Sequence, residues 1–251
     1  MFVPTPCACC LSTVVLASLG CVALFVFSIG QLLAYTLPKQ KLGLNIYKGL
    51  STLLNLIIVV VAIFFGVLTT NEDVRNYTFY KIIERGAVYP NPMDDLRCAN
   101  IRNLSGRVLE IGPGPGTNFR CWQNNTAITE WVGVEPNPFF KEKLTTESQA
   151  RNITFPMRTV WLKGENVDVD PGTFDYVVGT HVLCSVDDVY AVLRQVSRAL
   201  KPLGTYHFME HVAARESSTL HTWQQIFSPI LHVVGNGCKF KTLWNDLSST
   251  A

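Results

Sequence analysis

Three glycines at alternate positions, directly after a short apolar strand, are the residues of this chain most suited to binding chemistry. The segment 107–116 reads R-V-L-E-I-G-P-G-P-G and contains Glu110, Gly112, Gly114 and Gly116. Glycine lacks a Cβ and adopts positive φ readily, so a ligand can lie against bare backbone there. The dinucleotide fingerprint G-x-G-x-x-G needs a glycine three residues after Gly114, where this chain has Thr117. The spacing predicts a nucleotide-type site of another kind, with a plain glycine turn as the alternative.

A second acidic residue stands at the end of the next expected strand. The segment 131–137, W-V-G-V-E-P-N, reads as a strand that leads into Glu135 and Pro136. Glu135 follows the glycine loop by about twenty residues, the separation at which a doubly wound sheet places a carboxylate on ribose hydroxyls. A solvated carboxylate at a strand end is the alternative interpretation.

The elements that must position these residues alternate between strands and helices. Apolar runs predict strands at 107–111, 131–135, 159–162, 174–179 and 205–209. Between them, helices are expected at about 118–123, 139–149 and 187–200. This order predicts an α/β fold with a doubly wound, mostly parallel, Rossmann-like sheet, which binds ligands at the carboxyl ends of its strands.

Two long apolar runs precede this region. No charged residue occurs before Lys39 or between Lys48 and Glu72. The runs 11–37 and 50–70 each reach roughly the 20 residues that a helix needs to cross about 30 Å of hydrocarbon. We predict two apolar membrane helices, with a re-entrant hairpin as the alternative, and a lipid bilayer as a partner.

The predicted organisation therefore has three parts. Residues 1–70 form a membrane anchor, 71–104 a linker with a lead-in helix, and 105–251 a cofactor-binding domain.

The charge is divided unevenly between these parts. The chain has 21 basic and 19 acidic residues. Residues 1–70 hold three lysines and no acid, which leaves residues 71–251 with a net charge of −1. Proteins that bind nucleic acids carry a basic face. The balance argues against a nucleic-acid substrate and favours a small or lipophilic one.

Eight cysteines are scattered along the chain. Cys7 and Cys10 have C-x-x-C spacing, but no second pair follows, so we predict no metal site. Cys98, Cys121, Cys184 and Cys238 lie far apart in the second half. They are predicted to be unpaired, reduced thiols facing the cytosol.

Several segments resemble those of known enzymes. The G-x-G-x-G loop after Glu110 and the segment 174–186, F-D-Y-V-V-G-T-H-V-L-C-S-V, resemble class I S-adenosylmethionine-dependent methyltransferases. L-C-S-V, M-E-H-V, T-W-Q-Q-I-F-S-P and G-N-G-C, which lie between 183 and 238, are similar to the methyltransferase-like 7 family. That family consists of membrane-anchored methyltransferases that act on thiols. The resemblance covers roughly residues 100–247.

The resemblance implies S-adenosylmethionine as the cofactor and a small, lipophilic acceptor, a thiol. It places the cofactor against Glu110, Gly112, Gly114, Gly116, Glu135, Pro136, Gly164, Glu165, Asn166 and His181. His211 beside Glu210 is the leading candidate for an acid/base or substrate-orienting role, with a hydrogen-bonded structural histidine as the alternative. The family resemblance also implies the endoplasmic reticulum or lipid droplets, with the catalytic domain facing the cytosol.

Other interpretations stay open at this point. The chain could keep the cofactor fold only for a binding or assembly role, or it could be a nicotinamide-dependent oxidoreductase. A class I sheet usually has seven strands, and no strand pair is recognisable after 209. We therefore expect a truncated form that lacks the last strands and has low activity.

Overall fold

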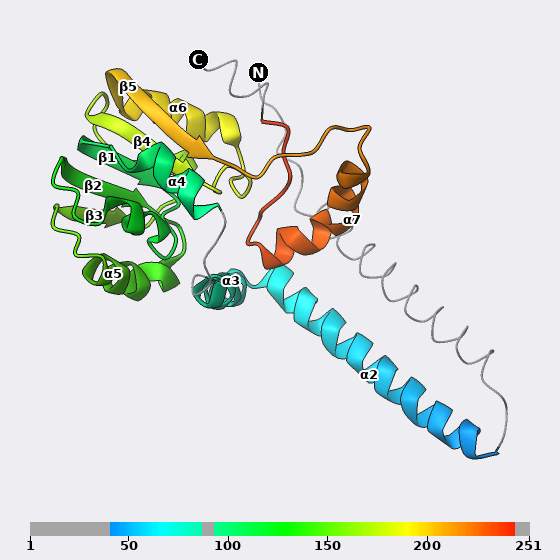
Figure 1. The fold of residues 1–251 in the computed structure, drawn as a ribbon. Helices are drawn as coiled ribbons and strands as arrows, with labels where there is room; N and C mark the ends of the chain where they lie inside the picture. The colour runs from blue at the N-terminus through cyan, green and yellow to red at the C-terminus, as the bar shows by residue number, and fades with distance from the viewer. Residues whose placement is uncertain (1–40, 87–92, 244–251) are drawn as a thin grey trace. The chain divides into compact units, whose positions relative to one another are not determined.

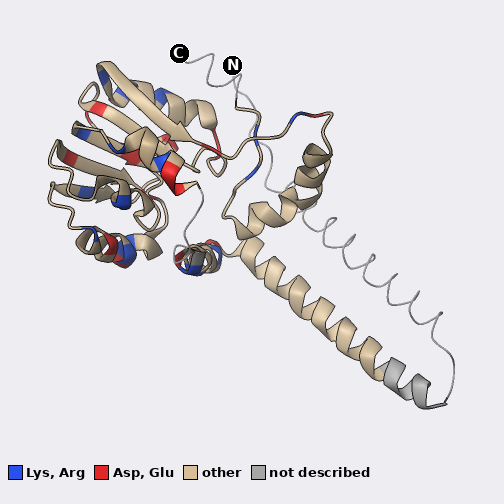
Figure 2. Cartoon of the chain, in the orientation of Figure 1, with Lys and Arg blue, Asp and Glu red and all other residues tan. Residues whose placement is uncertain are grey.

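A computed structural model describes residues 41–86 and 93–243, which divide into two compact units with a boundary after Arg75 (Figure 1). The first unit contains helix α2, Lys41–Thr70, and its segment Gly49–Thr70 is long and apolar enough to cross a membrane. That segment is tan throughout in Figure 2, because it contains no Lys, Arg, Asp or Glu. The helix expected over 50–70 is therefore present as part of α2. The run 11–37 lies outside the described residues.

The second unit is built on a sheet of five parallel strands. They are β1 Gly106–Ile111, β2 Ile128–Val134, β3 Met157–Val160, β4 Phe174–Thr180 and β5 Leu200–Met209. Their order is β3-β2-β1-β4-β5, and every neighbouring pair is parallel. Parallel neighbours need crossover connections, and helical segments supply them. The doubly wound, Rossmann-like sheet predicted from the alternation is confirmed.

Helices of different regularity connect and cover the strands. The α-helices are α3 Glu72–Gly86, α4 Asp94–Ile101, α5 Lys141–Ala150, α6 Val189–Ala199 and α7 Thr219–Val234. Three short 3-10 helices are η1 Thr117–Trp122, η2 Pro138–Phe140 and η3 Gly164–Asn166. Helix α6 begins two residues later than expected because the Asp188 carboxylate accepts from the Ala191 N–H and acts as its N-cap.

Alternation along the strands sends side chains into two separate cores. Leu109 and Val132 pack with Val192 and other apolar residues of α6 on one face. Val108 and Trp131 pack with Trp122 and residues of α4 and η1 on the other face. Figure 1 shows the sheet between these helical layers. The two layers fix the carboxyl ends of β1, β2 and β4 beside one another.

Strand β5 differs from the prediction at its beginning. It was expected to start at 205, but it starts at Leu200 and its pairing with β4 is shifted between Phe174 and Tyr176. Leu203 is fully exposed and has a φ of +69°, a conformation that favours glycine. Within the described residues, β5 is the end strand of the sheet.

Candidate functional site

The glycine loop leaves β1 at its carboxyl end, and its three glycines all have positive φ. A Cβ on Gly112 would lie only 2.6 Å from Cγ2 of Val182, whereas a Cβ on Gly114, which has a φ of +54°, would meet no described atom within 4 Å. Gly112 is thus required by close packing. Gly114 presents bare backbone to open space, which is the property a ligand cradle needs.

Glu135, directly after β2, fastens this loop. Its carboxylate accepts hydrogen bonds from the Gly114 N–H and the Asn137 N–H, both at 2.9 Å. The side chain is 5% exposed, and burial raises the pKa of Glu135 to about 7. Each carboxylate oxygen has a second lone pair, so Glu135 can still accept from ligand hydroxyls. Pro136, the next residue, is exposed.

Glu110 is buried and belongs to a hydrogen-bonded network. Its two carboxylate oxygens accept from Trp131 Nε1 and from Asn118 Nδ2, both at 2.8 Å. Asn118 also donates to Thr180 Oγ1 at 3.1 Å, so the network joins η1 to the end of β4. Sequence reasoning missed Asn118 and Thr180, because nothing in their spacing distinguishes them from ordinary polar residues. The network makes Glu110 a support for the loop.

Burial raises the pKa of Glu110 to about 7, which gives a testable dependence of stability on pH. The folded state then holds a proton that the unfolded chain has already released above about pH 4.5, so stability falls as the pH rises towards 7. Glu110→Gln, which stays neutral, should match the wild type at pH 4 and exceed it at pH 8 by an amount on the order of 3 kcal/mol. Urea unfolding of both proteins at several pH values measures this. Parallel curves would contradict the assignment.

The expected adenine-side residues lie on η3. Gly164 packs against the end of β1, where its Cβ would lie 2.9 Å from Cγ2 of Ile111. The Glu165 carboxylate accepts from the Asp187 N–H at 2.7 Å and the Asp188 N–H at 3.2 Å, so it holds the loop before α6. Asn166 is exposed.

The ends of β4 and β5 bring the remaining candidates together. His181 has a φ of +57°, and its ring stacks on that of His211 with centroids 4.2 Å apart. Burial, reinforced by His211, lowers the pKa of His181 to about 4. One Glu210 oxygen accepts from the backbone N–H groups of Val182 and Leu183, both at 2.9 Å. Glu210 thus braces the loop that carries His181, and burial raises the pKa of its carboxyl.

Several polar atoms in this part of the sheet are buried with no hydrogen-bond partner among the described residues. They include Nδ1 of His181, the second carboxylate oxygen of Glu210, Oδ1 of Asn118 and the Tyr206 hydroxyl. Buried polar atoms are normally satisfied, and an unmet one calls for an explanation such as a ligand.

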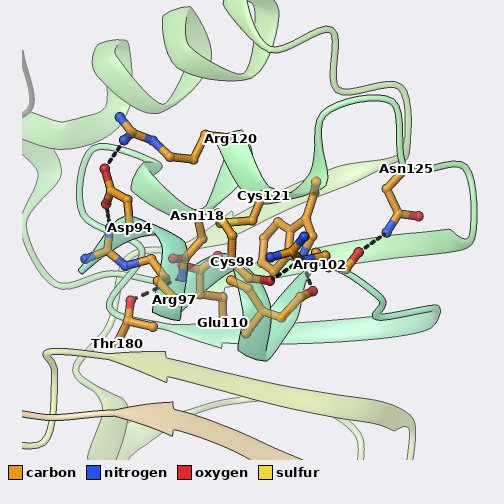
Figure 3. Close-up of a disulfide and its surroundings, with 12 residues drawn as sticks. Asp94, Arg97, Cys98, Arg102, Glu110, Asn118, Arg120, Cys121, Asn125 and Thr180 are labelled. Atoms are coloured by element: carbon orange, nitrogen blue, oxygen red, sulfur yellow. Dashed lines mark hydrogen bonds and ion pairs between the residues drawn. A yellow bond between two sulfur atoms is a disulfide. The ribbon is translucent and has the colours of Figure 1, made fainter. Parts of the chain in front are cut away.

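The cysteine prediction was wrong for one pair. Cys98 on α4 and Cys121 on η1 form a disulfide, with their Cα atoms 4.9 Å apart (Figure 3). Packing of α4 on η1 brings them into the range that a disulfide requires. Beside it, Asp94 pairs with Arg97 at 3.0 Å and with Arg120, so α4 and η1 are joined by charge as well. Element η1 follows the glycine loop directly, and these links stabilise one side of the site.

The sequence is similar to a known protein family and to individual enzymes. A family model described as methyltransferase domain matches residues 92–238. Human thiol S-methyltransferase TMT1A is 40% identical over 157 residues, which cover 59% of this chain and 63% of that protein. Human thiol S-methyltransferase TMT1B is 39% identical over 154 residues, which cover 59% of this chain and 62% of that protein. The matched segment therefore spans less than two thirds of either relative.

Solved structures share the fold. The YcgJ protein of Bacillus subtilis has a TM-score of 0.51 at 18% identity, covering 63% of this chain and 64% of that chain. A putative methyltransferase from Bacillus halodurans has a TM-score of 0.51 at 12% identity, covering 62% and 65%. The family model covers more than half of the sequence. The chain belongs to the methyltransferase domain family.

Proposed function

We propose that the protein is a membrane-anchored methyltransferase that transfers a methyl group from S-adenosylmethionine to a small, lipophilic thiol. The observation that carries this proposal is the contact between Gly114 and Glu135. An open, positive-φ glycine donates its N–H to a buried carboxylate at the carboxyl ends of adjacent parallel strands. Ligands of doubly wound sheets bind at this place.

The residues present fit such a donor. The bare backbone at Gly114 leaves space where a Cβ would otherwise stand. Glu135 would accept from the ribose hydroxyls, while Glu165 and Asn166 would adjoin the adenine. The unmet atoms of His181 and Glu210 offer further hydrogen bonds at the same end of the sheet.

Methyl transfer from such a donor depends mainly on how the enzyme orients the two reactants. The bound donor supplies a methyl group that is already activated by sulfonium charge. The chain has to hold the acceptor in line with that methyl group and exclude competing water. A thiol reaches its nucleophilic thiolate near neutral pH, so it needs little help from a base. His211, exposed beside the braced Glu210, is our candidate for orienting the acceptor or taking its proton.

The acceptor class can be tested directly. We expect turnover with lipophilic thiols and at least about tenfold less with matched amines and phenols, because those groups stay protonated or weakly nucleophilic at neutral pH. Formation of S-adenosylhomocysteine measures the rate. Donor binding without turnover on any acceptor would instead support a binding or assembly role.

Two surfaces support the membrane part of the proposal. Segment Gly49–Thr70 is apolar and uncharged. Helix α7 also exposes large apolar side chains, among them Trp223 and Phe227, whose rings stack with centroids 5.8 Å apart. Such a face suits lipid or a lipophilic acceptor. We place the protein at the endoplasmic reticulum or lipid droplets, with the second unit in the cytosol.

The anchor makes a prediction of its own. Residues 1–70 fused to a soluble reporter should stay in the membrane pellet after carbonate extraction, because apolar spans resist removal. A fragment that starts at Tyr77 should be released into the supernatant. Immunoblotting of the two fractions measures both. Release of the 1–70 fusion would refute the anchor.

A further inference from the structure

Three potential metal ligands meet beside the proposed donor site. The Sγ atoms of Cys184 and Cys238 are 3.0 Å apart, and Nδ1 of His211 lies 3.8 Å from each of them. All three ligand atoms lie within 4.8 Å of one another. Neither cysteine takes part in the Cys98–Cys121 disulfide, and both are free thiols.

Backbone contacts create this meeting. The Lys239 N–H donates to the Cys184 carbonyl at 2.9 Å, which ties the segment after α7 to the loop after β4. Gly237 has a φ of +96°, and a Cβ there would lie 3.0 Å from the Ser185 carbonyl oxygen. The close approach therefore needs glycine, and it sets Cys238 opposite Cys184.

Side-chain contacts also fix the positions of Cys184 and His211. Nζ of Lys241 donates to the carbonyls of Leu183 and Val186, on both sides of Cys184. His211 is held by its stack on His181. The three ligand atoms are thus preorganised by two segments and a strand end that are distant in sequence.

We propose that Cys184, Cys238 and His211 bind a zinc ion. Zinc takes thiolate sulfur at about 2.3 Å and imidazole nitrogen at about 2.0 Å in tetrahedral geometry, which separates its ligand atoms by roughly 3.5 to 3.8 Å. The two sulfur–nitrogen distances of 3.8 Å exceed the tetrahedral value of about 3.5 Å by only about 0.3 Å. The sulfurs need to move apart by less than about 1 Å, which small side-chain rotations provide.

The charges around the cluster also agree. Two thiolates balance the charge of the zinc ion. Binding releases the two thiol protons to solvent, while His211 coordinates as neutral imidazole through Nδ1. Cys184 is buried, whereas Cys238 is half-buried and His211 is exposed, so one side of the ion stays accessible.

Three protein ligands leave a fourth position open, which is typical of catalytic zinc. This step rests on the proposed function: the open position takes the sulfur of the acceptor thiol, whose proton passes to solvent because a coordinated thiol is held as thiolate. Its electron pair forms the new sulfur–methyl bond as the donor's sulfonium–methyl bond breaks, giving a thioether and S-adenosylhomocysteine. Val182, two residues before Cys184, packs against the Gly112 backbone, so the cluster adjoins the donor loop. His211 then orients the acceptor through the metal.

Cobalt substitution tests the site without relying on turnover. The reduced, metal-free full chain is titrated with Co²⁺ while absorbance is recorded. We expect one equivalent to give thiolate-to-cobalt charge-transfer absorption, which Zn²⁺ then removes. Cys184→Ser, Cys238→Ser and His211→Ala should each lose or markedly reduce it, whereas the matched variant His221→Ala should keep it. A thiol acceptor should shift the cobalt spectrum, and its S-methylated product should not.

Each other result overturns the proposal. The metal site would be refuted if the wild type showed no thiolate-to-cobalt absorption, or if a variant with both Cys184→Ser and Cys238→Ser kept it. A Cys184–Cys238 disulfide that survives the reducing buffer, found by peptide mass spectrometry, would make the pair a redox element. A cobalt spectrum that does not change when the thiol acceptor is added would refute binding of the acceptor to the metal. Donor affinity of the metal-free chain, measured by calorimetry, separates these failures from failure of the methyltransferase proposal.

Discussion

Replacing Gly114 with valine is expected to abolish measurable binding of S-adenosylmethionine. Gly114 has a φ of +54°, a conformation that costs a residue with a Cβ about 1 to 2 kcal/mol and is worst for a β-branched one. The new side chain would also project into the open space in front of the loop. Isothermal titration calorimetry with the purified protein measures the loss, which we expect to exceed about 100-fold because strain and occlusion act together.

Gly172 supplies the matched control. It has a φ of +64°, and a Cβ there would make only an ordinary contact, 4.0 Å from the Leu200 carbonyl oxygen, but it lies in the turn before β4, away from the glycine loop. Gly172→Val should therefore lower the melting temperature through the same backbone strain and leave donor affinity unchanged. If both variants bind the donor as well as the wild type does, the cradle is wrongly placed.

Replacing Glu135 with alanine should weaken donor binding by at least about 100-fold, because hydrogen bonds from two ribose hydroxyls to a charged acceptor are worth about 1.5 to 3 kcal/mol each. The change also leaves the N–H groups of Gly114 and Asn137 without their acceptor. Stability should change less than affinity, since removing a buried carboxylate relieves the desolvation that raises its pKa to about 7. Glu130→Ala, on strand β2 before Glu135 and paired with Arg107, is the control that should keep donor affinity.

The pH dependence of binding separates this role from a structural one. The ionised carboxylate is the better acceptor for ribose hydroxyls, so wild-type affinity should rise between pH 6 and pH 8 as Glu135 loses its proton near pH 7. Glu135→Gln should bind weakly with no such rise. An identical pH profile in the two proteins would exclude contact between Glu135 and the donor.

The sequence predicted the sheet well because strands and helices alternate with clear apolar periodicity. All five expected strands exist, and Phe174–Thr180 matches its prediction to within one residue. The helix expected at 118–123 is instead the 3-10 helix η1, since burial of Asn118, Phe119 and Trp122 against one face suits a tight turn. Strand β5 begins earlier than predicted because Leu200 pairs with Phe174 through the backbone. Such pairing does not depend on the pattern of apolar side chains from which the prediction was made.

The sequence could predict which site residues meet only where they lie at the ends of neighbouring parallel strands. Gly114 and Glu135 were paired by spacing alone, and the structure joins them by a hydrogen bond. The meeting of Cys184 with Cys238 depends on two irregular segments 54 residues apart, so no local pattern reports it. The same limit explains the error at Cys98 and Cys121, which helix packing brings together.

The Cys98–Cys121 disulfide can report on which side of the membrane the second unit lies. Glutathione and thioredoxin keep thiols reduced in the cytosol, whereas the lumen of the secretory pathway lets disulfides persist. The bond spans α4 and η1 in the unit that also holds the glycine loop. Its oxidation state in living cells therefore records which side of the bilayer that unit occupies. On the cytosolic side, reduction would leave the salt bridge between Asp94 and Arg120 as the charged link between α4 and η1.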